Sequence, residues 1–283
     1  MKAFSGFFVQ ALAQKGLNTP ILRLLCTVCL LFFVPQTALA QHTVQRDQEA
    51  LTIISQTIAA GGGQELLASI HDFTETGAIT YNWDEQVTGR VTVKSRKLDQ
   101  FRIDTELAEG KRTAVINGEA GLLTEANGRT FTIHRQGARD FWSLTLPYLP
   151  LIAGMRDSST SIIYGGTVTH NGASVYDVRL IKVYTAGQDP TGKRGNREAR
   201  DFFIDPRTFF VVAISDQIQY AQPLDESLPH EFSHEILYSN YQSENGISTP
   251  LTIEETVRDV TRFTINLSQV TFNSGMADAE FSW

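Results

Sequence analysis

The chain has 283 residues, of which 42% are hydrophobic, and it carries 24 Lys and Arg against 31 Asp and Glu, for a net charge of −7. This length and composition allow one domain with a large buried core. The acidic balance argues against a nucleic-acid partner and against broad attachment to anionic membranes.

Residues 1–40 have the pattern of a secretory signal peptide. They contain no Asp or Glu, and basic residues precede the apolar run LLCTVCLLFFV at 24–34, which is too short for a stable membrane span. The small-residue site Ala38-Leu39-Ala40 follows this run. We expect cleavage after Ala40 and export of residues 41–283 to the periplasm.

The mature chain, residues 41–283, is predicted to be a single domain without cysteine, because Cys26 and Cys29 both lie in the signal. A metal or redox role for this C-x-x-C pair is therefore not expected. The signal contains three of the basic residues and none of the acidic ones, so its removal leaves a net charge of −10. No later apolar run is long enough for a transmembrane segment.

Residues 45–70 are predicted to form a helix, a break at Gly61-Gly62-Gly63 and a second, short helix. Leu51, Ile54 and Ile58 recur at the spacing of one helical face. We expect this amphipathic helix to pack on a sheet.

Beyond these helices the hydrophobic period changes to two. In the segments 73–83, 87–94 and 100–104, apolar residues alternate with polar ones. One apolar face and one solvated face are typical of antiparallel strands.

The segment 138–157 interrupts this alternation. It is bulky and apolar, and Pro147 and Pro150 are too close together for one regular strand or helix. We predict one or two short helices with a kink, which either fill the core or cover a cavity.

Strand-like segments resume after residue 157 and continue into the tail FTINLSQVTFN. The polar stretch 185–199 is predicted to be a hairpin tip, and Asn-Gly pairs at 117, 127, 171 and 245 predict tight turns. The chain is therefore predicted to be an α+β domain, mostly antiparallel sheet with helices at its N-terminus and in its middle.

The sequence HEFSH at 230–234 matches the zinc-protease pattern H-E-x-x-H, which requires a helix so that both imidazoles and the carboxylate face the metal. The residues that follow alternate as in a strand, and on a strand His230 and His234 would lie roughly 13 Å apart, too far for one metal. No third ligand stands at the expected spacing. We expect a chance match and keep a zinc hydrolase using His230, Glu231 and His234 as a remote alternative.

The loop GQDPTGK at 187–193 is similar to a phosphate-binding loop, but Arg194 stands where Ser or Thr should hold magnesium. No helix is predicted to follow and offer its N-terminus to phosphates. We therefore expect no nucleotide, no metal and no other cofactor. No further catalytic motif occurs, so we expect a protein that is not an enzyme.

The order of these elements resembles the LolA-like superfamily of exported bacterial proteins, which includes the outer-membrane lipoprotein carriers. The resemblance covers nearly the whole mature chain, although no lid arginine of the carriers can be matched. Its most specific parts are the turn Asp205-Pro206-Arg207-Thr208, the stretch from Tyr241 through Asn245-Gly246-Ile247 to Pro250, and the closing pattern Val270-Thr271-Phe272-Asn273 with Asp278 and Phe281.

This resemblance implies a half-open β-barrel. A curved, mostly antiparallel sheet would have its concave face covered by the N-terminal and central helices, with an apolar cavity between them. The implied function is that of a non-enzymatic periplasmic carrier for lipid or for the acyl chains of a lipoprotein. Apolar side chains of the first strands and the central segment would line the cavity. The candidates are Phe73, Tyr81, Trp83, Phe101, Phe141, Trp142, Leu146, Tyr148, Leu151 and Met155.

Two alternatives remain open besides the carrier. The same fold serves as a sensor or protein-interaction domain, with an envelope protein as partner and no bound lipid. The zinc hydrolase is the more remote one. Bound lipid, a protein partner without lipid, and stoichiometric zinc would distinguish the three.

Overall fold

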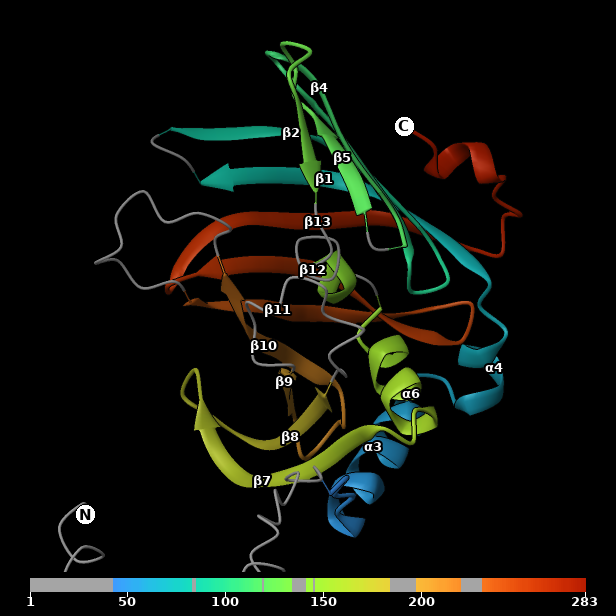
Figure 1. Ribbon diagram of the computed structural model, residues 1–283, viewed down its shortest axis with the longest axis vertical. Coiled ribbons are helices and arrows are strands. Elements are labelled where there is room, and N and C mark those ends of the chain that lie inside the picture. Colours follow the sequence, from blue (N-terminus) through green and yellow to red (C-terminus); the bar gives the residue numbers. More distant parts are fainter. Residues whose placement is uncertain are drawn as a thin grey trace, which may run out of the picture. The chain divides into compact units, whose positions relative to one another are not determined.

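The alternating segments of the sequence form one antiparallel sheet in the computed structural model of the protein. The structure describes residues 43–82, 85–118, 120–133, 141–144, 146–183, 197–219 and 231–283, and from Val44 onward these belong to one compact unit. Within them the sheet has 13 strands and curves without closing (Figure 1). The predicted class is confirmed: an α+β fold with a curved, mostly antiparallel sheet and helices on its concave face.

The strands follow the chain from one hairpin to the next. They are β1 (Asp72–Asn82), β2 (Gln86–Arg96), β3 (Gln100–Leu107), β4 (Gly110–Asn117), β5 (Ala120–Thr124), β6 (Thr130–Ile133), β7 (Thr160–His170), β8 (Ala173–Val183), β9 (Arg197–Ile204), β10 (Val211–Gln219), β11 (Glu231–Glu244), β12 (Ile247–Val257) and β13 (Val260–Phe272). The helices are α3 (Gln48–Ala60), α4 (Gln64–Ala68) and α6 (Tyr148–Arg156), with the short 3-10 helices η1 (Phe141–Leu144) and η2 (Asp278–Phe281).

The predicted hairpin tip 185–199 was too long at its C-terminal end. Residues 197–199 belong to β9 and pair with β8. Charged residues can occupy a strand here because they pair with each other, as Arg200 does with Glu198 at 3.0 Å.

The first and last strands of the sheet lie side by side in its middle. β1 pairs with both β2 and β13, and Ile79 of β1 is opposite Ile265 of β13. The two edges are β6 and β7, and in the chain η1 and α6 come between them. The apolar central segment therefore connects one edge of the sheet to the other.

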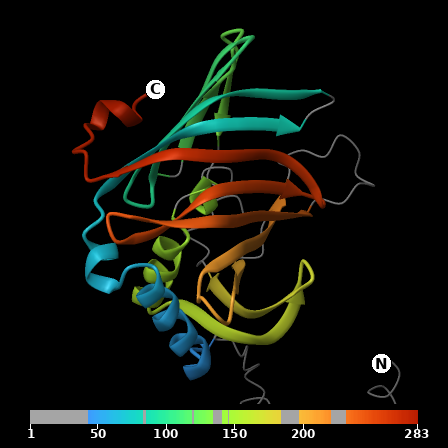
Figure 2. The ribbon, with the colours of Figure 1, turned by 180° about the vertical axis from the view of Figure 1, so that it is seen from behind.

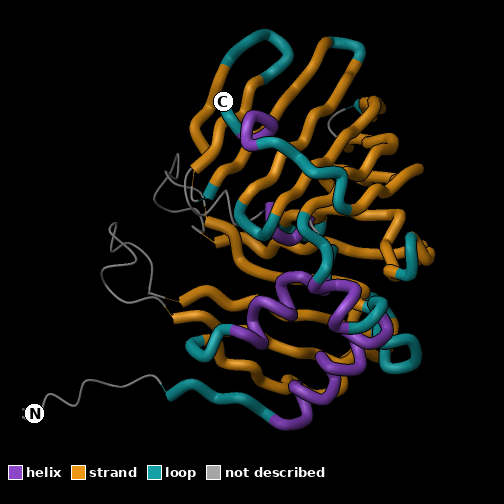
Figure 3. The backbone as a smooth tube through the Cα atoms, turned by 90° about the vertical axis from the view of Figure 1, so that its right-hand side faces the viewer, coloured by secondary structure: helices purple, strands orange, loops and turns teal. Residues whose placement is uncertain are grey.

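Helices α3 and α6 pack against each other and against β7 (Figures 1 and 3). Ile54 and Ile58 are buried in the core as the helical spacing predicts, and Leu51 is half-buried. Pro147 precedes α6 and Pro150 lies in its first turn, where a missing amide hydrogen costs no helical hydrogen bond. Among the described residues, none of the helices is both long enough and apolar enough to pass through a membrane.

Two of the predicted Asn-Gly turns show why these residue types are needed. Asn171 and Gly172 have φ angles of 47° and 79°, and Asn245 and Gly246 have φ angles of 52° and 84°. Positive φ at both positions is the type I′ turn, whose twist matches that of a two-residue hairpin. The turns set the registers of β7 with β8 and of β11 with β12.

The C-terminal residues lie along the outer face of β2, β3 and β4 (Figure 2). Lys94 Nζ is 2.6 Å from Glu280 Oε2, and Arg102 donates a hydrogen bond to the carbonyl oxygen of Glu280 at 3.2 Å. Phe281 is fully buried under the guanidinium of Arg96, which lies 5.3 Å from its ring centroid. The tail is therefore part of the packed fold.

Asp72 anchors the start of this tail. Its carboxylate accepts hydrogen bonds from the backbone N–H groups of Ser274, Gly275 and Met276 at 2.7, 3.0 and 3.3 Å, and from the Ser274 hydroxyl at 2.8 Å. Burial by itself raises the pKa of Asp72, but the hydrogen bonds outweigh it and hold the pKa below its ordinary value.

Replacing Asp72 with Asn is expected to lower the free energy of unfolding by about 1–3 kcal/mol at neutral pH, because an amide nitrogen would face backbone donors. Since the folded-state pKa is lowered, the contribution of Asp72 is present above its ordinary pKa of 3.8 and is lost as the pH falls through the folded value. Chemical denaturation at neutral and acidic pH measures both effects. Asp278→Asn, at a side chain that is 95% exposed, is the control. Equal stability of the Asp72→Asn variant and the wild type would contradict the role of Asp72 as the anchor of the C-terminal tail.

Candidate functional site

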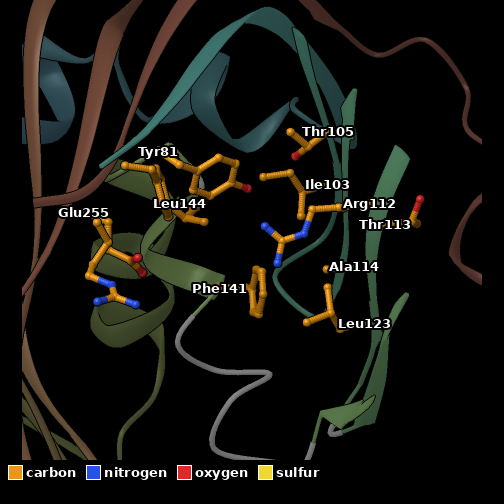
Figure 4. Close-up of a pocket in the computed structure, with 12 residues that line it drawn as sticks. Tyr81, Ile103, Thr105, Arg112, Thr113, Ala114, Leu123, Phe141, Leu144 and Glu255 are labelled. Carbon is orange, nitrogen blue, oxygen red and sulfur yellow. The ribbon is translucent and has the colours of Figure 1, made fainter. Parts of the chain in front are cut away.

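A partly open cavity of about 280 Å³ lies on the concave side of the sheet (Figure 4). Strands β3, β4 and β5 form one side of it, β12 and β13 form the other, and η1 lies beside it. Apolar and aromatic side chains make up the larger part of the lining, with polar and charged ones set among them. The lining residues are Tyr81, Ile103, Thr105, Arg112, Thr113, Ala114, Leu123, Phe141, Leu144, Glu255, Arg262 and Phe263.

The strand registers bring these side chains to one face. Residues directly opposite each other on antiparallel strands point to the same side of the sheet. Thr105 of β3 is opposite Arg112 of β4. Tyr81 of β1 is opposite Phe263 of β13, which is in turn opposite Glu255 of β12.

The central segment supplies another wall of the cavity through η1. Phe141 packs against Phe101 of β3 with ring centroids 5.4 Å apart, and Leu144 is only 5% exposed. A single 3-10 turn makes few hydrogen bonds of its own, so this wall depends on the apolar contacts of its side chains.

Arg112 and Tyr81 form the polar middle of the cavity (Figure 4). The Arg112 guanidinium lies 2.7 Å from Glu125 and 5.5 Å from the Tyr81 ring centroid. Burial raises the pKa of Tyr81, and a hydrogen bond with Thr105 offsets part of that rise. The phenol is therefore a neutral hydrogen-bonding group at physiological pH.

A row of alternating charges extends from the cavity wall across the inner face of the sheet. Glu255 lies 3.2 Å from His234 Nε2, and Asp216 lies 2.7 Å from His234 Nδ1. Arg200 approaches Asp216 at 3.5 Å. Burial alone lowers the pKa of His234, but the two carboxylates outweigh it and raise the pKa to about 10. The imidazole is therefore protonated, and each nitrogen donates to a carboxylate.

This arrangement also bears on the H-E-x-x-H match. Residues Glu231–Glu244 form strand β11, so the prediction of a strand is confirmed, while His230 lies outside the described residues. Both nitrogens of His234 are engaged with carboxylates and have no lone pair for zinc. Within the described part of the chain, no three His, Cys, Asp or Glu side chains are grouped to hold a metal ion. The phosphate-loop match at 187–193 also lies outside the described residues.

The ten residues predicted to line the cavity lie in several different parts of the structure. Tyr81 and Phe141 line the 280 Å³ cavity. Phe73 borders a second cavity of about 260 Å³, formed by α4, α6 and the first residues of β1. Phe73 is itself fully buried, as are Phe101, Leu146, Tyr148 and Leu151, and Met155 packs half-buried against the core. Trp83 and the side chain of Trp142 lie outside the described residues.

The charged residues of the cavity, above all Arg112, Glu255 and Arg262, were not predicted from the sequence. One signal was available for Arg112, because it alternates with the apolar residues Ala114 and Ile116 and so places a cation on the face that they share. Nothing comparable marks Arg262, whose orientation depends on an irregularity in strand pairing.

No protein-family model and no curated protein matches the chain. Among the solved structures similar to it are the following three. They are a putative outer membrane lipoprotein-sorting protein domain from Vibrio parahaemolyticus (14% identity, TM-score 0.47), a DUF1329 family protein from Desulfovibrio piger (10%, 0.49) and the LolA superfamily protein NE2245 from Nitrosomonas europaea (11%, 0.49). The matches cover 82%, 82% and 83% of this chain and 96%, 97% and 97% of theirs. Likeness at this level carries no argument on family, ligand or activity.

Replacing His234 with Gln tests the charge row. Because the folded-state pKa of His234 is raised to about 10, its contribution to stability is complete below its ordinary pKa of 6.5 and is lost as the pH rises toward 10. The wild type is expected to be more stable than the variant near neutral pH, and the difference in unfolding free energy should shrink steadily with rising pH. His71→Gln, at an exposed histidine, is the control. A difference that is constant from pH 6 to 10 (roughly the window between the two pKa values) would show that His234 is neutral.

Proposed function

We propose that the protein is an exported, non-enzymatic carrier that binds a hydrophobic ligand, a lipid or a lipoprotein acyl chain, in the cavity beside η1. The observation that carries the proposal is the cavity itself, which is mainly apolar, partly open and bounded by the sheet on two sides. Binding sites for small apolar molecules have this character, with a few polar groups that fix orientation.

The physical chemistry of an acyl chain suits this cavity. Each methylene removed from water contributes about 0.8 kcal/mol, so an apolar wall that is already formed binds such a chain without further folding. Transfer requires release as well as binding. The wall made by η1 is short and is attached through apolar contacts such as Phe141 with Phe101, so it can move without breaking the strand ladder.

The volume limits what can bind. A cavity of about 280 Å³ lies just below the range for small-molecule sites, about 300–1,000 Å³. One short acyl chain is therefore a better fit than a lipid with several chains. We propose the periplasm as the location, because residues 1–40 have the pattern of a signal peptide.

Phe141→Asp is the variant that tests this function. A carboxylate in the apolar wall is expected to weaken the binding of a fluorescent fatty-acid probe by tenfold or more, since burying an unpaired charge costs more than about 1.4 kcal/mol. Because Phe141 is only half-buried, we expect a smaller loss of unfolding free energy than at a core position. Leu151, which is fully buried, is unsuitable, because a charge there would unfold the protein.

The matched control is Trp283→Asp. Trp283 lies in the C-terminal tail beyond η2, is 58% exposed and does not line the cavity, so probe binding should be unchanged. Equal loss of binding in the two variants, or parallel losses of binding and stability in Phe141→Asp, would contradict the site. A wild-type protein that binds no probe but retains a protein partner would indicate the sensor or interaction domain instead.

A further inference from the structure

The cavity has a charged side and an apolar side, and this polarity identifies the kind of hydrophobic ligand. Resting on the carrier function proposed above, we infer that the ligand is a single-chain amphiphile with an anionic head group, carboxylate or phosphate, which is held at Arg262.

Arg262 reaches the cavity because of a β-bulge. Strands β12 and β13 pair Glu255 with Phe263 and then Thr256 with Thr261, so Arg262 is the extra residue between two regular pairs. A bulge places on one side of a strand a residue that regular alternation would turn away, and bulges occur often next to binding sites. Phe263 and Arg262 therefore both line the cavity, although they are neighbours in the chain.

The other charged side chains around the cavity are already paired, so Arg262 is the cation that can bind an anion. Arg112 is paired with Glu125 at 2.7 Å. Glu255 is neutralised by the protonated His234 at 3.2 Å. Among the described residues, no hydrogen bond or ion pair is made by the side chain of Arg262.

The head group and the chain would lie on opposite sides of the cavity. Figure 4 shows Glu255, which belongs to the same wall as Arg262, on one side and Leu123 and Ala114 on the other. In the sheet, β12 and β13 are separated from β4 and β5 by the strands β1, β2 and β3. An anionic head at Arg262 would therefore direct its chain past Phe141 toward Leu123.

The same arrangement disfavours other ligands. A cationic head would be repelled by Arg262, which carries a permanent charge. A neutral head would gain no charge-assisted hydrogen bond from a guanidinium, the donor best suited to carboxylate and phosphate. The volume of about 280 Å³ again favours a ligand with one acyl chain over a ligand with several.

Calorimetric titration of the protein with four ligands of equal chain length tests the inference: decanoate, decyl phosphate, decanol and decyltrimethylammonium. Because Arg262 is exposed, its ion pair should be modest, and we expect an anionic ligand to bind about fivefold more tightly than decanol. The cationic ligand should bind most weakly. The stronger of decanoate and decyl phosphate identifies which anion the site prefers.

Arg262→Gln should weaken the preferred anion about fivefold and leave the decanol Kd unchanged, while Arg262→Lys should retain most of the preference. Arg90→Gln, at an arginine that is 85% exposed and distant from the cavity lining, should change neither ligand. Equal binding of decanol and the anions by the wild type, or equal weakening of both by Arg262→Gln, would overturn the inference but not the carrier function. Failure of all four ligands to bind would overturn both.

Discussion

The structure depends on how much of the inner face of its sheet the helices can cover. Thirteen strands present a long apolar face that must be removed from water. Helix α3 has 13 residues and a length of about 20 Å, and α6 is shorter, with 9 residues. These two helices fill the concave side near β7 and β8. Farther along the sheet, within the described part of the chain, only the single turn of η1 is available, and there the packing leaves a cavity.

The charged residues of the interior follow from the same constraint. Where helices cover the sheet, the contact between them is apolar, as at Ile54 of α3, Leu151 of α6 and Phe202 of β9. Beyond the helices, the inner-facing positions of β9 to β12 carry Arg200, Asp216, His234 and Glu255. Each charge lies beside an opposite one, which is the condition under which buried charges are tolerated. The row thus marks the boundary between the packed core and the cavity.

The fold was largely predictable from the sequence because its elements depend on local patterns. Period-two alternation, Asn-Gly turns and the helical spacing of Ile54 and Ile58 are each determined within a few residues of chain. The cavity was less predictable, because it lies where the side chains of the sheet and the central segment do not fill the space between them. Buried Leu151 and cavity-lining Phe141 are equally apolar and lie in the same segment, so only their partners distinguish them. The bulge at Arg262 arises from the way β12 and β13 pair, so it cannot be predicted from the sequence of either strand alone.

The most direct test of the account is native mass spectrometry of the protein purified gently from the periplasm of an expression host. The account predicts a fraction of molecules with one non-covalent adduct of the mass of a single-chain lipid, and loss of that adduct in a variant whose cavity wall is disrupted. A bare protein mass in every preparation, with the cavity residues intact, would contradict the central claim that this cavity holds a hydrophobic ligand.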